Sequence, residues 1–388
     1  MRIGINALSI IPGKIGGGEV YLSNLIKNLA KIDKENIYLL FLTDDNRDLF
    51  NIAQHNFKEV ICSVWPRNFL GRLLYENVIL PLLIWKYRID VFHSPANISP
   101  LVLPCSSVLT IQYLTYFEFP ITFSKMRLRS LRFMIQSSCQ KADRIIAISK
   151  YTKKKIVRYT DIPEEKVAVV YHGVDEMFGP LLDLKRKYDI RQMFNITDDY
   201  ILSVATSHRH KNVTGIVKAF NYLRRNYGIS SKLVHVGLKG YQHEEFLKIM
   251  AKTELEDEII ILGYISHRQM PLLYKAAELL VALPYDESFG LPLIEAMASG
   301  VPVVTSNIAA PPEIVGDAGA VVDPDNVPEI AEAIWQLLTD QELRRTVSAK
   351  GLERAKKFSW EKTAEETLQV FQEVYSQGTI HRRREKAL

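Results

Sequence analysis

Short aliphatic and β-branched runs alternate along the chain with longer amphipathic stretches, and this alternation constrains the fold more than any other feature of the sequence. It predicts two doubly wound, Rossmann-like parallel α/β domains. Ligands of such domains bind at the carboxyl ends of the strands, so we expect the active site in the cleft between the domains. We expect helices at 19–31, 125–141 and 361–374, and strands at 2–7, 37–42, 90–93, 108–112, 144–148, 167–170, 200–204, 232–236, 259–262, 279–282 and 301–305.

The length of the chain favours the same two-domain organisation. With 388 residues, 47 % of them hydrophobic, the chain can fill two separate cores. The segment 178–180, Phe-Gly-Pro, and the charged stretch 183–188 are typical of a linker. We therefore expect an N-terminal domain at 1–180, a C-terminal domain at 181–358, and a final helix with a basic tail at 359–388.

The apolar and cysteine patterns indicate a cytoplasmic protein. No apolar run reaches the ~18 residues that a membrane-spanning helix needs. The longest candidate, 73–85, is interrupted by Glu76, Asn77 and Pro81, and the first residues have the pattern of a strand rather than of a secretory signal. The spacing of the three cysteines fits neither a metal site nor a redox pair; they are Cys62, Cys105 and Cys139.

In segment 286–300, DESFGLPLIEAMASG, Glu287 and Glu295 are separated by seven residues. Pro292 suits the first position of a helix and Gly300 its end, which predicts Glu287 in a loop and Glu295 in the first helical turn. The unpaired N–H groups and positive dipole end of such a helix suit phosphate or sugar oxygens. The alternative is an ordinary buried helix face with two solvated glutamates.

This segment belongs to a longer ordered pattern. Together with 262–264, 272–278, 306–307, 312–318, 322–324 and 358–360, it resembles the C-terminal domain of the retaining glycosyltransferases of family four. The resemblance implies the GT-B fold, in which two Rossmann-like domains face each other across a cleft and the last helix packs back on the first domain. It also implies a nucleotide sugar as co-substrate, with no metal required.

The resemblance assigns roles within the donor site. It implies that Glu287 holds hydroxyl groups of the transferred sugar, that Glu295 binds the ribose, and that the turn at Tyr264 and Ile265 meets the base. The loop and helix start complete the implied donor site with Ser288, Phe289, Gly290 and Leu291.

Residues 207–212, SHRHKN, follow the first strand of the second domain and resemble the Arg-Lys-Asn turn of the same family. A lysine beside a cleft can neutralise the charge that builds on a leaving diphosphate, so we expect Lys211 in this role and Arg209 as a second cation. His210 stands where arginine is common in the family. A solvated basic turn is the alternative, and a zinc site at His208 and His210 lacks further ligands at suitable spacing.

Two segments of the first half also resemble donor-contacting parts of the family. Glycines 16–18 are expected directly after the first strand and at the start of a helix, where Gly17 and Gly18 would approach the diphosphate. A turn without a ligand is the alternative. Gln112 stands where many relatives carry a histidine that reaches the transferred sugar; glutamine can hydrogen-bond a hydroxyl but cannot act as a base. His172, in a turn near the domain junction, is expected to be structural.

Positive charge is concentrated in the first domain. Residues 1–180 contain 23 Lys and Arg against 16 Asp and Glu, and eleven of these bases lie between 121 and 158, with one acid. The interleaved apolar residues favour a helix that lies on an anionic membrane. The alternatives are a solvated positive face and nucleic acid, for which no binding module is present. The expected membrane or acceptor surface comprises Lys125, Arg127, Arg129, Arg132, Lys153 and Lys154.

The sequence therefore favours a retaining glycosyltransferase that moves mannose from GDP-mannose to a glycan or lipid-linked acceptor in cell-surface polysaccharide synthesis, such as that of lipopolysaccharide. We expect it at the inner face of the membrane, as a peripheral protein. The alternatives are a UDP-sugar-dependent transferase, a nucleotide-sugar epimerase of the same fold, and a non-catalytic subunit that binds glycan or supports a partner.

Overall fold

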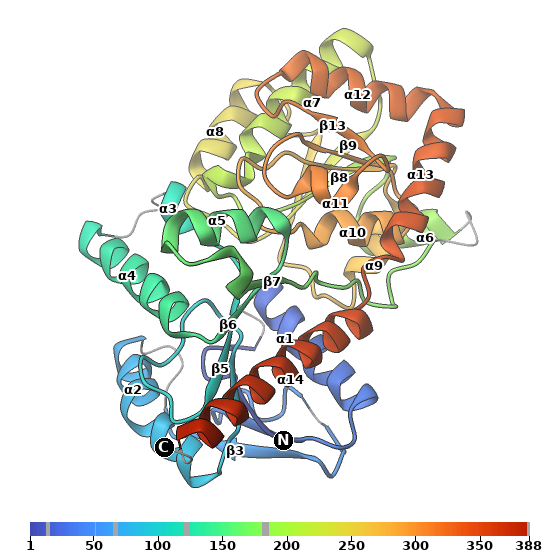
Figure 1. Ribbon diagram of the computed structural model, residues 1–388. Coiled ribbons are helices and arrows are strands. Elements are labelled where there is room, and N and C mark those ends of the chain that lie inside the picture. Colours follow the sequence, from blue (N-terminus) through green and yellow to red (C-terminus); the bar gives the residue numbers. More distant parts are fainter. Residues whose placement is uncertain (13–15, 51, 65–68, 120–123, 181–185, 386–388) are drawn as a thin grey trace. The chain divides into compact units, whose positions relative to one another are not determined.

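The computed structural model describes the chain except residues 13–15, 51, 65–68, 120–123, 181–185 and 386–388, and the side chains of 186 and 379–385. The chain forms two compact units, one made of Met1–Gly173 with Trp360–Leu388 and the other of Val174–Ser359. In the described residues, each unit contains one sheet with helices packed around it (Figure 1), and the strands of each sheet pair in parallel. The expected class, two doubly wound parallel α/β domains, is confirmed.

The described part of the first unit contains a seven-stranded sheet in the order β3-β2-β1-β4-β5-β6-β7. The chain leaves β1 toward one edge and returns to β4 on its other side, which makes the β1–β4 pair a topological switch point. The strands are β1 Arg2–Asn6, β2 Ile37–Leu42, β3 Phe57–Ile61, β4 Val91–Ser94, β5 Ser106–Ile111, β6 Arg144–Ala147 and β7 Val167–Val169.

The last helix of the chain completes the first unit. Helix α14 lies against α1 (Figure 1), and Trp360 at its start lies beside the stacked rings of Tyr21 and His172. Arg144 of β6 pairs with Glu373 of α14 at 3.1 Å. The helices are α1 Gly16–Ile32, α2 Phe69–Lys86, α3 Thr115–Glu118, α4 Lys125–Lys141, α5 Lys150–Thr160, the 3-10 turn η1 Glu164–Lys166 and α14 Trp360–Glu385.

The described residues of the second unit form a six-stranded sheet in the order β10-β9-β8-β11-β12-β13, with its switch point between β8 and β11. Its strands are β8 Tyr200–Val204, β9 Lys232–Val236, β10 Ile259–Gly263, β11 Leu279–Ala282, β12 Val303–Ser306 and β13 Ala320–Val322. Its helices are α6 Arg186–Met193, η2 Arg209–Lys211, α7 Val213–Tyr227, α8 His243–Lys252, α9 Met270–Ala276, α10 Leu291–Ala298, α11 Pro311–Val315, α12 Val327–Thr339 and α13 Gln341–Ala355.

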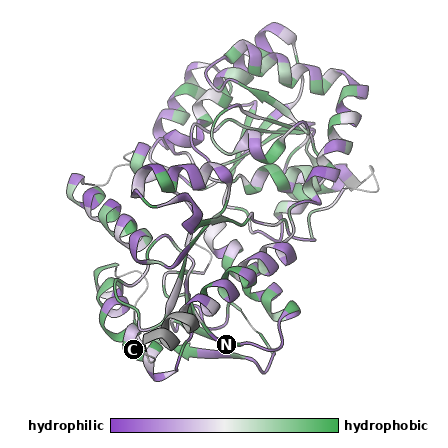
Figure 2. Ribbon diagram, viewed as in Figure 1, coloured by the Kyte–Doolittle hydropathy of each residue, from purple (hydrophilic) through white to green (hydrophobic). Residues whose placement is uncertain are grey.

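Helix α7 shows how local sequence sets these elements. The Asn212 side chain accepts a hydrogen bond from the Gly215 amide at 3.1 Å and so caps the helix start. Ile216, Phe220 and Leu223, spaced by four and three residues, form its buried face against the core of the second unit. Many helices show alternating hydrophilic and hydrophobic faces in Figure 2.

Several details differ from the expectation. Edge strands β3 and β13 were not foreseen, and the start of the expected linker is structured: Phe178 is buried in the second unit against the ring of Tyr274. The units divide at Gly173 and Val174, where the sequence placed the boundary near residue 180. Residues 183–185 of the expected linker and the side chains of the basic tail lie outside the described residues. No helix among the described residues is long and apolar enough to cross a membrane.

Candidate functional site

The loops that follow β8 and β11 meet at the switch point of the second unit. These strands pair in parallel, so their carboxyl ends lie at the same edge of the sheet. The carbonyl oxygen of His210, in the loop after β8, accepts hydrogen bonds from the amides of Tyr285 at 2.7 Å and Asp286 at 3.2 Å. This backbone connection holds the Ser-His-Arg-His-Lys-Asn turn next to the segment that carries Glu287.

The side chains of Lys211 and Glu287 meet between these loops. The Lys211 Nζ donates to Glu287 Oε2 at 2.6 Å, and the two side chains keep 24 % and 20 % of their surface exposed. The other carboxylate oxygen of Glu287 accepts the amides of Ser288 at 3.0 Å and Phe289 at 3.4 Å. The pair is therefore fixed in position yet accessible, with a cation and an acceptor of hydroxyl hydrogen bonds side by side.

The start of helix α10 differs from the expectation in one respect. Gly290 caps the helix with φ of 102°, a backbone conformation that favours glycine, and a Cβ there would lie 2.8 Å from the Leu293 side chain. The helix begins at Leu291 and Pro292 is its second residue. Glu295 consequently lies in the second turn, not in the first.

Glu295 is a buried carboxyl group. Only 8 % of its surface is exposed, and Oε2 accepts a hydrogen bond from the Tyr274 hydroxyl at 2.8 Å. Burial raises the pKa of Glu295 to about 7; the hydrogen bond from Tyr274 opposes this rise, and nearby Asp175 adds to it. Its role as the ribose ligand stays a prediction.

The basic turn contains one buried neutral histidine. Burial and then the neighbouring Lys211 lower the pKa of His210 to about 4, so at neutral pH it is uncharged and stacks on the ring of His208. His210 therefore adds no positive charge where arginine is common in the family. Arg209 is exposed, and Lys211 is the cation that contacts Glu287.

The remaining predicted donor residues lie at other loops and at one helix start. Tyr264, 59 % exposed, and half-buried Ile265 follow β10. Gly17 and Gly18 lie in the first turn of α1, which begins at Gly16. They do not follow the first strand directly, because the chain continues beyond Asn6 through a turn in which the Ile10 amide donates to the Ala7 carbonyl. The roles of these residues stay predictions.

Gln112 follows β5 in the first unit and is 8 % exposed. Its Nε2 donates to the Pro95 carbonyl at 3.2 Å, and its backbone amide donates to Asn97 Oδ1 at 2.7 Å. Because a carbonyl can only accept, the amide nitrogen is directed to Pro95, and Oε1 is the atom of this amide that can accept a further hydrogen bond. The contact of Gln112 with the transferred sugar stays a prediction.

A polar pocket that no sequence motif predicted lies at the switch point of the first unit. Glu76 of α2 is buried, its Oε1 accepts from Asn6 Nδ2 at 3.1 Å, and Arg72 Nε lies 3.9 Å from the same oxygen. Burial raises the pKa of Glu76, and Arg72 and Asn6 oppose this rise. The sequence feature that could have indicated this pocket is Glu76, the one glutamate inside the apolar run 73–85. The pocket is lined by Asn6, Ser9, Phe69, Arg72, Leu73, Glu76, Pro95, Ala96 and Ile98.

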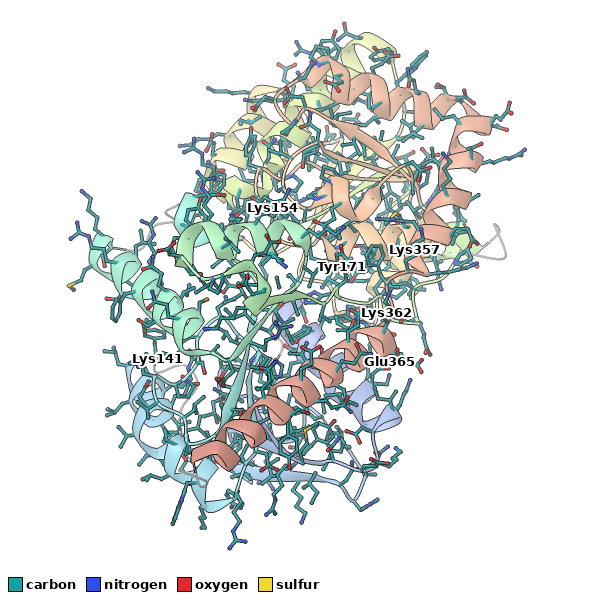
Figure 3. All side chains as sticks on the ribbon, viewed as in Figure 1. Lys141, Lys154, Tyr171, Lys357, Lys362 and Glu365 are labelled. Carbon is teal, nitrogen blue, oxygen red and sulfur yellow. The ribbon has the colours of Figure 1, made fainter. Side chains whose placement is uncertain are left out.

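The basic residues expected at a surface divide into two groups. Four of them are exposed, namely Lys125, Arg127, Arg129 and Lys154. Of these, Lys154 lies on α5 and is labelled in Figure 3. Arg132, in contrast, is half-buried and donates to the carbonyl groups of Tyr116 and Phe117, and Lys153 pairs with Glu164 at 3.3 Å. Arg132 thus has a structural role in this unit. Within the described part of the chain, no group of three or more His, Cys, Asp or Glu residues could hold a metal ion.

Comparisons with known proteins identify relatives of both units. The model of the family "Glycosyltransferase Family 4" matches residues 15–177, and that of "Glycosyl transferases group 1" matches residues 186–354. O-antigen chain mannosyltransferase B of Escherichia coli is 30 % identical over 78 % of this chain and 83 % of its own length.

Solved structures show the same fold at low identity. Sucrose-phosphate synthase of Thermosynechococcus elongatus is 19 % identical, with a TM-score of 0.77 over 97 % of this chain and 99 % of its own. Anabaena HepE, solved with UDP and glucose, is 19 % identical, with a TM-score of 0.75 over 96 % of this chain and 100 % of its own. These matches confirm the expected GT-B fold. The chain belongs to the family-four glycosyltransferases.

Proposed function

We propose that the chain transfers mannose from GDP-mannose, with retention of configuration, to a glycan or lipid-linked acceptor of a cell-surface polysaccharide such as O-antigen. The contact between Lys211 and Glu287 at the β8–β11 switch point carries this proposal, because it combines a diphosphate-binding cation with a sugar-binding carboxylate. The similarity to the O-antigen mannosyltransferase of Escherichia coli supports mannose as the sugar.

In this proposal Lys211 and Glu287 have different roles in glycosyl transfer. The bond between the anomeric carbon and the diphosphate breaks while the acceptor oxygen bonds to that carbon on the same face. The acceptor proton moves to the departing phosphate oxygen, and the nucleoside diphosphate leaves. Lys211 stabilises the negative charge that builds on the diphosphate. Glu287 orients the sugar by accepting hydrogen bonds from its hydroxyl groups, while Glu295 accepts from the ribose through Oε1.

Donor binding is tested first by thermal unfolding in the presence of nucleoside diphosphates and their sugars. A ligand that binds only the folded state stabilises it by about 2.7 kcal/mol at roughly 100 times its Kd, so GDP and GDP-mannose are expected to raise the Tm by several degrees. Adenosine and cytidine diphosphates are the matched controls and are expected to leave the Tm unchanged.

The same measurement separates the alternatives. A shift with UDP-sugars alone would replace the guanosine donor by a uridine donor, which is the nucleotide present in the HepE structure. A shift with no nucleotide would favour the non-catalytic glycan-binding subunit. Conversion of a nucleotide sugar without an added acceptor would favour the epimerase, for which additional acid–base carboxylates would be expected in the first domain.

We propose further that a hydroxyl group of the acceptor sugar enters the pocket around Glu76, whose volume of about 30 Å³ admits a group of that size but not a sugar ring. The pocket lies where ligands bind in doubly wound sheets, at the carboxyl ends of β1 and β4. Its carboxylate, guanidinium and amide groups can accept and donate the hydrogen bonds that sugar hydroxyls require.

Glu76→Gln is expected to raise the KM for the acceptor about tenfold, because one hydrogen bond to a charged group is lost. The fold should tolerate the change, since glutamine has the same shape and burial already opposes the charge. The Tm shift with GDP-mannose should stay as in the wild type, and Glu59→Gln on exposed β3 is the control. A loss of the nucleotide shift, with the acceptor KM unchanged, would contradict the assignment.

The proposed location is the cytoplasmic face of a membrane, where the protein is held peripherally. Lys125, Arg127 and Arg129 are exposed along α4, and each base near an anionic surface contributes about 1 kcal/mol of attraction. A lipid-linked acceptor would bring the protein to such a surface. No nucleic acid is implied.

A further inference from the structure

Helix α2 presents an apolar stripe on its outer side. Five of its residues have at least 51 % of their surface exposed and recur at intervals of four, four, four and three residues, which places them on one side of a helix. They are Leu70, Leu74, Val78, Leu82 and Trp85, and we call them the α2 stripe. Large apolar residues repeated in this way on the surface of one helix mark an interaction site.

The opposite side of the helix holds it in the first unit. Leu80 and Ile84 are fully buried in a core cluster with Leu39 and Phe92, and Glu76 faces the polar pocket. The helix thus has an inner face that is packed and an outer face that no other described segment covers. Figure 2 shows α2 with hydrophobic colouring along much of its length.

Positive charge lies next to the α2 stripe. The guanidinium of Arg127 lies 6.0 Å from the ring centroid of Phe69 at the start of α2, so the N-terminal ends of α2 and α4 are adjacent. Helix α4 exposes Lys125, Arg127 and Arg129 and contains no Asp or Glu, and the one acid of α2, Glu76, is buried. Exposed apolar side chains continue on α4 with Met126 and Phe133, which are 78 % and 65 % exposed.

The apolar surface also extends beyond these helices. The Leu101 amide donates to the Asn77 Oδ1 of α2 at 2.9 Å, which brings the adjacent Val102, 69 % exposed, close to the stripe. The helix ends with Trp85 and Lys86. Trp is common at the level of the lipid headgroups, because its indole is amphipathic, and Lys can extend its ammonium group from an apolar surface into water.

We propose that the α2 stripe inserts into the headgroup region of an anionic bilayer, with the bases of α4 held against the lipid phosphates. The inference deepens the proposed membrane-surface role, because it names the inserting helix and requires apolar burial as well as charge. Charge favours a bilayer over a second copy of the chain, since pairing two such surfaces would bring like charges together without acids to neutralise them.

The test uses the full chain and vesicles of phosphatidylcholine with or without phosphatidylglycerol. Flotation is expected only with the anionic vesicles, and Leu74→Gln with Leu82→Gln should lower the partition coefficient at least about tenfold. Met193→Gln, at an exposed apolar position of α6 in the second unit, is the matched control and should float like the wild type. Because both stripe positions are exposed, the Tm of the double variant should not change.

The fluorescence of Trp85 distinguishes insertion from adsorption. Its emission is expected to shift to the blue on anionic vesicles, and Trp85→Phe should abolish the shift while flotation persists. The inference is overturned if the double variant floats like the wild type, if high salt removes all binding, or if the Trp85 emission stays constant. Self-association that the double variant abolishes, with vesicle binding intact, would assign the stripe to a second copy. The GDP-mannose shift in Tm, measured in parallel, reports on the donor site independently.

Discussion

Glu287→Gln is expected to lower kcat by about 10²–10³-fold, the effect of removing one positioned polar group that acts on the transition state. Glutamine keeps the shape of the side chain, but it removes the charge that pairs with Lys211 Nζ at 2.6 Å and weakens the acceptance of hydrogen bonds from sugar hydroxyls. Initial rates of nucleoside diphosphate release, measured with GDP-mannose and an acceptor, give kcat and KM.

The control is Glu256→Gln, a change at an exposed carboxylate in the loop between α8 and β10. It should retain full activity and the wild-type Tm. If Glu287→Gln turned over donor at the wild-type rate with its fold intact, Glu287 would have no role in the reaction. If only the KM for the donor rose, Glu287 would bind the sugar without acting on the transition state.

Lys211→Met is expected to lower kcat to a similar extent, because the leaving diphosphate loses the cation beside it. Methionine preserves much of the apolar stem and removes the ammonium. Lys211→Arg should rescue only part of the activity, since a planar guanidinium cannot occupy the position of a compact ammonium. The matched control is Lys218→Met, at an exposed position on α7, where activity should be unchanged.

Rates for the double variant test whether Lys211 and Glu287 act together. Two groups that act on one transition state are expected to give losses that do not add, so the double variant should be little worse than either single one. Strictly additive losses would show that the two side chains act independently and would remove the contact as the basis of the proposed site.

The two strands that the sequence did not predict, β3 and β13, both lie at the edge of a sheet. Four other strands have the expected bounds: β2, β8, β9 and β11. Each is a short, mostly apolar run, which is the sequence pattern of a parallel strand that is buried on both faces. In contrast, β3 exposes three of its five residues, Lys58, Glu59 and Ile61, and β13 has three residues. Edge strands are short and polar, and such segments are hard to distinguish from loops.

The site was predictable where its residues lie close in sequence and not where the fold brings them together. Glu287 and Lys211 were each expected from local motifs, but their contact depends on the pairing of β8 with β11. The hydrogen bond from Tyr274 to Glu295 and the pocket around Glu76 join residues of different elements, and no local pattern indicates them. The outer side of α2 was equally hidden, because an apolar run does not show which of its residues will be covered.

The return of α14 to the first unit sets an order of assembly during synthesis. The second unit is one continuous segment whose ends meet, since the Val174 amide donates to the Phe358 carbonyl at 3.0 Å and Val174 forms a bridge with Ser359. It can therefore close its core as soon as residue 359 has left the ribosome. The first unit, although translated earlier, waits for Trp360 and the helix behind it to cover Tyr21 and His172. The half of the chain made first is thus completed last.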